Sequence, residues 1–180
     1  MKEEELLIQK AQRGESEAFG VLYDAYLPKI YRFIYLKVTS KADAEDITHH
    51  VFMNSWENIG SFRFQGVPFS SWLYRIAHNA VIDFYRTRKN TVDIESVIET
   101  EAADIPIDGD VLDTRYEAEK VHTALKTLKP DEQSVVIMKF INELSNAEVS
   151  VALEKSEGAI RVIQHRALKN LKKQLEQQTK

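Results

Sequence analysis

The sequence has no cysteine, which excludes disulfide bonds and thiolate zinc sites. Only four prolines and six glycines interrupt its 180 residues, and Leu, Ile, Ala, Glu and Lys dominate, which favours helices. No stretch approaches the ~18 apolar residues of a membrane helix. The N-terminus is acidic and lacks the apolar run of a signal peptide. We therefore expect a cytoplasmic protein with no membrane insertion of its own.

The net charge of −4 hides an uneven distribution along the chain. Residues 1–90 hold 12 basic and 11 acidic residues. Residues 91–119 hold one basic and ten acidic residues, and residues 120–180 hold 11 basic and 7 acidic residues. A near-neutral block, an acidic connector and a basic block indicate separate tasks.

Helical periodicity runs through the first half of the chain. Ser16 is a candidate N-cap, and Pro28 can open the next helix. Ser40 can cap a third helix that runs to about Ile59. The Gly- and Pro-containing segment 60–71 is predicted to be a loop, which a fourth helix follows to about Arg88.

The second half gives a similar pattern after residues 91–112, which have no clear period. Pro130 is expected to open a helix that runs through Phe140. Ser145 and Glu148 fit a capping box ahead of a short helix to Leu153, and the last helix runs from about Glu157 to Leu175. The fold class predicted is all-α, with two small helical domains joined by a flexible acidic linker.

Helix, short turn and helix near the C-terminus form the layout of a DNA-reading helix-turn-helix. The last helix has an apolar face of Ile160, Ile163, Ala167, Leu171 and Leu175. Its other face is basic: Arg161, His165, Lys169 and Lys172, with Arg166 and Lys173 beside them. A basic helical face can enter the major groove. The alternative is that this basic face is an ordinary solvated surface. The capped short helix that precedes the last helix favours DNA binding over that alternative.

The third helix has an unusual polar face opposite its apolar residues Ala44, Ile47, Val51 and Ser55. Met53 lies among Asp43, Asp46, His49, His50 and Glu57. A flexible apolar side chain among acids suits a protein-binding surface. Asp46, His49 and His50 also suggest a metal site. That alternative is weak because neighbouring histidines diverge by about 100° on a helix.

The fourth helix carries a polar stripe opposite its apolar face of Leu73, Ala77, Ala80 and Phe84. The stripe consists of Arg75, Asn79, Ile82 and Arg86, and Arg88 and Lys89 extend its charge. Such donors suit a nucleic-acid backbone and base edges. Just before it, Phe62, Phe64 and Phe69 stand with Arg63, Gln65 and Gly66, a composition that can hold unstacked bases. Taken singly, such phenylalanines are more often core residues than base platforms, and for Trp72 a core position is favoured over a stacking role.

Three segments in this order resemble extracytoplasmic-function (ECF) sigma factors of bacterial RNA polymerase. Residues 43–56 resemble the helix that binds the polymerase clamp, and residues 72–86 resemble the promoter-melting segment. Residues 145–171 resemble the C-terminal helix-turn-helix. Three features depart from the family pattern. His49-His50 stand where Gln-Glu is usual, Glu154 stands where a glycine often shapes the turn, and Ser150 replaces a small apolar residue at the packing site between the two helices.

The resemblance implies domain limits and site residues. Residues 1–90 would form a sigma-two-like domain, 91–115 an acidic linker and 116–180 a sigma-four-like domain. Polymerase binding would fall to Asp43, Asp46, His49, His50 and Met53. The minus-ten element would be bound by Arg63, Phe64, Gln65, Arg75, Asn79, Arg86, Arg88 and Lys89. The minus-thirty-five element would be bound by Ser156, Glu157, Gly158, Arg161, Val162, His165, Arg166 and Lys169.

The resemblance predicts an alternative sigma factor that acts by binding and not by catalysis. Its expected partners are core RNA polymerase, promoter DNA as duplex and as melted strand, and an anti-sigma factor. No cofactor and no metal are expected. The competing hypothesis is a helix-turn-helix regulator that binds DNA without polymerase. An enzyme is less favoured, because the sequence shows no phosphate loop and no nucleophile motif.

Overall fold

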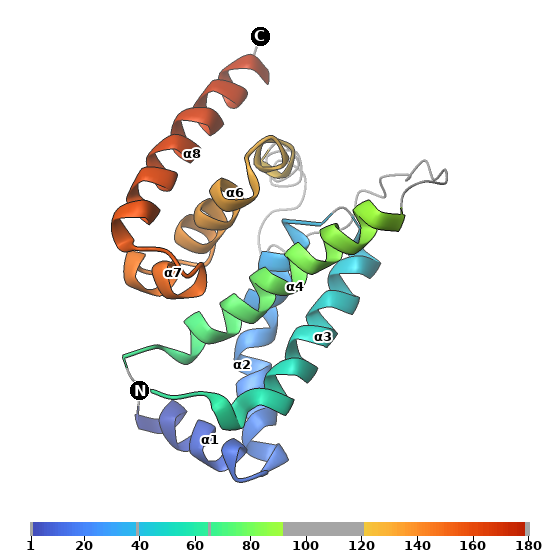
Figure 1. Ribbon diagram of the computed structural model, residues 1–180, viewed down its shortest axis with the longest axis vertical. Helices are drawn as coiled ribbons and strands as arrows, with labels where there is room; N and C mark the ends of the chain where they lie inside the picture. Colours follow the sequence, from blue (N-terminus) through green and yellow to red (C-terminus); the bar gives the residue numbers. More distant parts are fainter. Residues whose placement is uncertain (1, 39, 65, 92–120, 179–180) are drawn as a thin grey trace, which may run out of the picture.

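The computed structural model describes residues 2–38, 40–64, 66–91 and 121–178, and within these ranges every regular element is helical (Figure 1). The predicted all-α class is therefore confirmed for the described residues. The N-terminal module consists of α1 (Lys2–Gln12), α2 (Ser16–Tyr35), α3 (Lys41–Asn58), a 3₁₀ turn (Ile59–Ser61) and α4 (Phe69–Thr91). The C-terminal module consists of a helical segment over residues 121–126, α6 (Pro130–Val136), a π-helical turn (Ile137–Ile141), α7 (Asn146–Ala152) and α8 (Glu157–Gln178).

The helix α2 continues through Pro28, so the prediction that Pro28 opens a new helix is wrong. A proline inside a helix removes one backbone hydrogen bond. The apolar stripe explains why the helix continues, because Leu22 lies before Pro28, Ile30 and Phe33 lie after it, and all three are buried. Glu15, and not Ser16, is the N-cap residue of α2.

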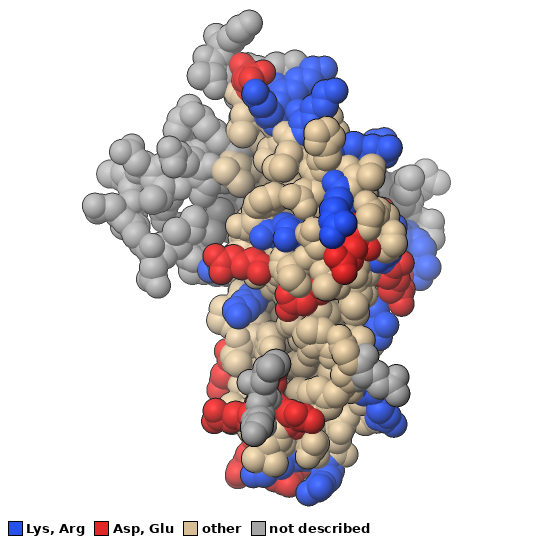
Figure 2. Space-filling model, turned by 90° about the vertical axis from the view of Figure 1, so that its left-hand side faces the viewer, with Lys and Arg blue, Asp and Glu red and all other residues tan. Residues whose placement is uncertain are grey.

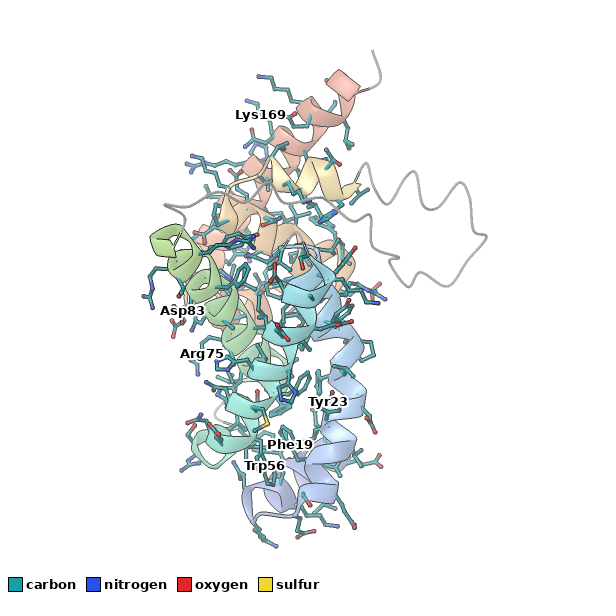
Figure 3. All side chains as sticks on the ribbon, turned by 90° about the vertical axis from the view of Figure 1, so that its right-hand side faces the viewer. Phe19, Tyr23, Trp56, Arg75, Asp83 and Lys169 are labelled. Carbon is teal, nitrogen blue, oxygen red and sulfur yellow. The ribbon has the colours of Figure 1, made fainter. Side chains whose placement is uncertain are left out.

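The helices α3 and α4 complete the N-terminal module. The Ser40 hydroxyl caps α3 by accepting a hydrogen bond from the Asp43 amide at 3.2 Å, as predicted. Aromatic rings pack α3 against α2: the Phe19 and Trp56 rings are tilted with centroids 5.0 Å apart, and Tyr23 meets Phe52 edge-on at 4.6 Å (Figure 3). The helix α4 extends past its expected end at Arg88 to Thr91.

The C-terminal module begins α6 at Pro130, as predicted, and the Glu132 carboxylate accepts a hydrogen bond from the Lys129 amide at 3.4 Å. Its α-helix then widens into a π-helical turn. The predicted capping box of α7 is confirmed: the Glu148 amide donates to the Ser145 hydroxyl at 3.2 Å, and the Ser145 amide donates to the Glu148 carboxylate at 2.8 Å.

The predicted linker, residues 91–115, lies outside the described residues except for the backbone of Thr91. The domain limits 1–90, 91–115 and 116–180 therefore stay predictions. What the structure does describe is the contact between the two modules, in which α7 lies beside α4 (Figure 1) and the Ser134 hydroxyl of α6 lies 3.3 Å from Nδ1 of His78 on α4. One buried cluster of apolar side chains includes residues from both modules.

Candidate nucleic-acid and protein interfaces

The polar face predicted on α3 lies at the surface. Asp46, His49 and His50 are exposed, and Met53 is 47% exposed. Asp43 is half-buried, because its carboxylate pairs with the Arg88 guanidinium of α4 at 3.2 Å. Behind this face the predicted apolar residues are buried: Ala44, Ile47, Val51 and Ser55. Four of the five proposed polymerase contacts are thus available to a partner.

Two of the predicted sites adjoin at a groove between α3 and α4. The groove has a volume of about 620 Å³, and Asp43, Asp46, His50, Asp83 and Arg88 contribute its charged lining. It brings the proposed polymerase face next to one end of the proposed promoter stripe. Within the described residues no three His, Asp or Glu side chains come together as a metal site requires, so the alternative at Asp46, His49 and His50 gains no support.

The stripe predicted on α4 is only partly open. Asn79 is exposed, and Arg86 is exposed with its guanidinium 2.9 Å from Asp83 on the same helix. Arg75 is different, because its guanidinium lies 3.5 Å from the Glu154 carboxylate in the turn between α7 and α8. Figure 3 labels Arg75 and Asp83 at successive heights along α4. The side chain of Lys89 lies outside the described residues.

The aromatic residues before α4 divide into a buried set and one at the surface. Phe62, Phe69 and Trp72 are buried and pack their rings together, with centroids 5.4–5.5 Å apart. Phe64 is 36% exposed and meets Phe62 edge-on at 5.0 Å. Of the three phenylalanines considered as base platforms, Phe64 is the one that the structure leaves at the surface. Trp72 is a core residue, as favoured.

The base of this loop is fixed by hydrogen bonds that the sequence did not reveal. The Gln12 side chain donates to the Ile59 carbonyl at 3.0 Å and to the Phe62 carbonyl at 2.9 Å. Arg63 donates to the Gly60 carbonyl at 2.6 Å and to the Phe62 carbonyl at 2.9 Å. Gln12 is therefore a positioning residue for the loop, while the predicted contact Gln65 lies outside the described residues.

The helix α8 presents the predicted basic face to solvent (Figure 2). Arg161, His165, Arg166 and Lys169 are exposed, and Val162 is 50% exposed. Ile160 and Ala167 are buried on the opposite face, Ile163 and Leu171 are half-buried, and Leu175 is 37% exposed.

The start of α8 uses some of its predicted contact residues for its own structure. The Ser156 hydroxyl accepts a hydrogen bond from the Ala159 amide at 3.2 Å and so caps the helix. Glu157 lies 3.4 Å from Arg161, in an exposed pair that contributes little to stability. Gly158 is exposed, and a Cβ there would meet only the Ser156 hydroxyl at 3.9 Å. The end of the helix is thus open to an approaching duplex.

The turn ahead of α8 keeps the backbone conformation that a glycine would adopt. Glu154 has a φ of +53°, in the left-handed region that residues other than glycine rarely enter.

Among the helices that the structure describes, none combines the length and the apolar composition of a membrane-spanning segment.

Comparisons with known proteins give the family. The model of sigma-70 region 2 matches residues 22–91, and the model of sigma-70 region 4 matches residues 118–171. The ECF RNA polymerase sigma factor SigW of Bacillus subtilis is 32% identical over 93% of this chain and 94% of its own length. The sigma factor BldN of Streptomyces coelicolor is 35% identical over 92% of this chain, which spans 63% of that protein.

Two solved structures share the fold. CnrH, in complex with the cytosolic domain of CnrY, has a TM-score of 0.75 over 97% of both chains at 22% identity. The sigma factor RpoE of Bartonella quintana, in complex with the anti-sigma factor NepR, has a TM-score of 0.74 at 23% identity and covers 88% of this chain and 96% of that one. With its two sigma-70 regions and its likeness to SigW over almost the whole length, the chain belongs to the ECF RNA polymerase sigma factors.

Proposed function

We propose that the chain is an alternative sigma factor that directs core RNA polymerase to a set of promoters and promotes DNA opening there. The observation that carries the proposal is the exposed basic face of α8 behind a capped α7, in a chain whose other module matches sigma-70 region 2. The function is binding, and the chain performs no covalent chemistry. We expect it to act in the cytoplasm, where its polymerase and DNA are.

The exposed face of α3 is the proposed contact with the polymerase. Asp46 and His49 offer a carboxylate and an imidazole, and Met53 offers a flexible apolar side chain among them. An apolar centre with a polar rim is the usual composition of a protein interface. Asp43 contributes through its pair with Arg88, which holds α3 against α4.

The minus-ten element is the proposed ligand of α4 and the loop before it. Asn79, Arg86 and Arg88 offer amide and guanidinium donors to phosphates and base edges. Phe64, with its exposed ring, is the proposed stacking partner for an unpaired base. Stacking is worth about 1–3 kcal/mol per base, which offsets the few kcal/mol that flipping a base costs. DNA opening then follows from tighter binding of the unpaired strand than of the duplex.

The minus-thirty-five element is the proposed ligand of α8. Its N-terminal turns carry Arg161, Val162 and His165 on the exposed side, and the first turns of a recognition helix usually meet the base edges. Arg166 and Lys169 follow on the same side and suit phosphates, whose neutralisation makes binding salt-dependent.

We also expect an inhibitory protein partner, because the RpoE structure named above is a complex with an anti-sigma factor.

The test is transcription from fragmented genomic DNA of the source organism by purified core polymerase, with and without this protein. Sequencing the 5′ ends should give new start sites that share two upstream motifs at a fixed spacing. Absence of new starts, while a housekeeping sigma factor works in the same assay, would contradict the proposal. Binding to specific duplex DNA without polymerase would then favour the second candidate, a free helix-turn-helix regulator.

A further inference from the structure

The last residue of α1 binds the backbone at the start of the loop before α4. The side-chain amide of Gln12 donates to the Ile59 carbonyl at 3.0 Å and to the Phe62 carbonyl at 2.9 Å, across 47 and 50 positions of sequence. An amide group carries two N–H donors, so one side chain can bind both carbonyls at once. Because these carbonyls stand at the start and just past the end of the 3₁₀ turn, Gln12 fixes where the chain leaves α3 and enters the loop.

The Phe62 carbonyl is also the partner of a residue proposed to bind DNA. The Arg63 guanidinium donates to the same oxygen at 2.9 Å. The Phe62 ring is buried and meets the exposed ring of Phe64 edge-on, with centroids 5.0 Å apart. Phe64 is the proposed stacking partner of an unpaired base. The positions of both proposed contacts, Arg63 and Phe64, therefore depend on the backbone of Phe62, which Gln12 binds.

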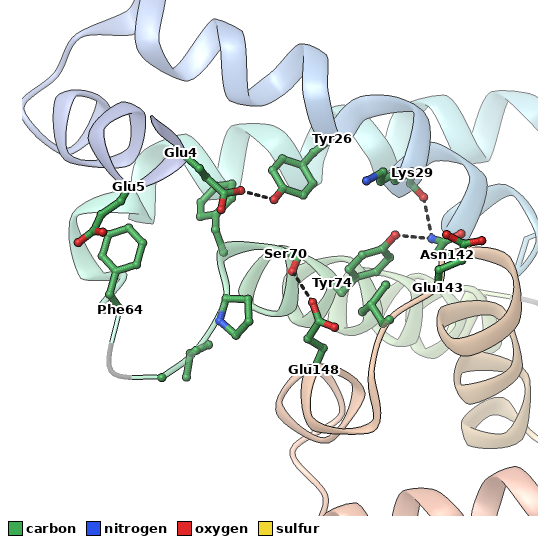
Figure 4. Close-up of a pocket in the computed structure, with 15 residues that line it drawn as sticks. Glu4, Glu5, Tyr26, Lys29, Phe64, Ser70, Tyr74, Asn142, Glu143 and Glu148 are labelled. Carbon is green, nitrogen blue, oxygen red and sulfur yellow. Dashed lines mark hydrogen bonds between the residues drawn. The ribbon is translucent and has the colours of Figure 1, made fainter. Parts of the chain in front are cut away.

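The first turn of α1 is connected to the other end of the same loop. The Tyr26 hydroxyl of α2 donates to the Glu4 carboxylate (Figure 4). The Tyr26 ring meets Phe69, the first residue of α4, edge-on with centroids 5.5 Å apart. Glu4 and Phe64 line one cavity of about 670 Å³. The helix α1 thus supports the loop at both ends, directly through Gln12 and indirectly through Glu4.

The helix α1 can support the loop because its own position is fixed. Ile8 and Ala11 are buried in the apolar cluster that also contains Phe62. The helix ends at a turn in which Gly14 adopts a φ of +90° and its amide donates to the Ala11 carbonyl at 2.9 Å. The match to sigma-70 region 2 begins at residue 22, so α1 lies outside it. A contribution of α1 to promoter binding would therefore come in addition to that of the matched region.

We propose that α1 is part of the minus-ten binding site, and that Gln12 is a positioning residue that holds Arg63 and Phe64 where they meet the unpaired strand. This inference rests on the proposed function of the loop. Gln12 acts through the Phe62 carbonyl and needs no DNA contact of its own. Contacts held in place before binding bind more tightly and discriminate better between bases. Loss of Gln12 should therefore weaken both properties at the minus-ten element and leave duplex binding by α8 unchanged.

Two substitutions of Gln12 test the inference. Gln12→Glu keeps the size of the side chain and replaces both N–H donors by a carboxylate oxygen, which can only accept and is repelled by the two carbonyls. Gln12→Met removes the donors without adding charge and has a similar helix propensity, so it remains informative if Gln12→Glu folds poorly. Gln9→Glu makes the same change as Gln12→Glu at an exposed position of the same helix and is the matched control.

Each full-length variant is assembled with core polymerase, and its affinity for a labelled single strand that carries a mapped minus-ten element is measured. We expect Gln12→Glu and Gln12→Met to bind the strand about tenfold more weakly than wild type and Gln9→Glu do, because two hydrogen bonds that hold the loop are lost. The affinity for core polymerase should stay that of wild type. Equal strand affinities of wild type and all variants would overturn the inference.

Transcription from promoter libraries separates positioning from a general loss of stability. One library randomises the minus-ten element of a mapped promoter, and the other randomises its minus-thirty-five element. Gln12→Met should reduce the base preference within the minus-ten element and leave the preference within the other element intact. A uniform fall in transcripts with both preferences unchanged would mean that Gln12 only stabilises the fold, and would overturn the inference. The proposed function is tested separately, because it depends on the start sites of the wild-type protein in the same libraries.

Discussion

Among single residues, Glu154 combines backbone strain with an ion pair across the module contact. Its φ of +53° is a conformation in which an ordinary residue is destabilised by about 1–2 kcal/mol. Its pair with Arg75 is at the surface, where such pairs contribute at most about 1 kcal/mol. The sequence marks this position, since the family often has glycine there, and the structure shows that the left-handed turn is kept.

Replacing Glu154 by glycine should therefore stabilise the protein slightly. Relief of the left-handed strain outweighs the greater backbone entropy of glycine in the unfolded chain, and we expect a gain of about 0.5–1 kcal/mol. The midpoint of urea unfolding at pH 7 measures it. Glu157→Gly, at a helical position, is the matched control and should lower the midpoint. A lower midpoint for Glu154→Gly as well would show that the turn is unstrained.

His78 gives the module contact a dependence on pH. Burial is the main cause that lowers its pKa to about 4, and the charges of Lys37 and Lys155 lower it further while Asp131 raises it. The unfolded chain therefore binds a proton near pH 6.5 that the folded chain refuses until about pH 4. The stability that the neutral ring supports is full above pH 6.5 and is lost as the pH falls towards 4.

Lowering the pH from 7 to 4.5 should thus destabilise the wild-type protein by about 2–3 kcal/mol more than the variant His78→Asn. Urea unfolding at the two pH values measures the difference, and carboxylates that titrate in the same range cancel in the comparison. His49→Asn, at an exposed position on α3, should behave like wild type. If His78→Asn lost as much stability as wild type, a neutral buried His78 would be excluded.

Substitutions on the exposed face of α3 test the proposed contact with the polymerase. Asp46→Arg reverses a charge at the centre of that face and should reduce binding to core polymerase at least tenfold, because an unfavourable charge at an interface opposes association. Asp24→Arg makes the same change at an exposed position of α2 and should bind normally. Titration of labelled protein with core polymerase measures both affinities. Equal binding by the two variants would remove Asp46 from the interface.

A substitution on α8 tests whether this helix recognises the bases of duplex DNA. Arg161→Ala should reduce transcription from mapped promoters by a factor of about 5 to 100, and base preference should relax at one position of the upstream motif. Lys126→Ala, which removes an exposed positive charge elsewhere in the same module, is the matched control. Transcript counts from a promoter library give both readouts. An unchanged preference combined with reduced counts would assign Arg161 to the phosphate backbone.

The elements themselves could largely be predicted, because apolar periodicity and caps are local signals. Ser40 and the box of Ser145 and Glu148 mark the starts of α3 and α7 correctly. The prediction that Pro28 starts a helix is wrong, because apolar residues before and after it are buried and α2 stays continuous through the proline. On α4 the sequence indicated one buried face and missed a second, formed by Tyr74, His78 and Val81. Two of these three side chains carry polar atoms, so their helical spacing did not stand out as apolar.

For the whole molecule, the charge distribution predicted separate modules and could not predict that they dock. The contact joins residues far apart in sequence, such as Lys37 with Ser134 and Tyr74 with Asn142. Each partner is an ordinary polar residue in its own surroundings, and only the folded chain brings the pairs together. The basic face of α8 was visible in the sequence, because a helical period alone places its residues.

The central claim is that one chain recognises two promoter elements with two modules: α4 and the loop before it bind the minus-ten element, and α8 binds the minus-thirty-five element. The most direct measurement is transcription by core polymerase with this protein from a mapped promoter, and from two templates in which one of the two elements is replaced. The account predicts loss of the start site from both altered templates. A start site that persists when either element is replaced would contradict it.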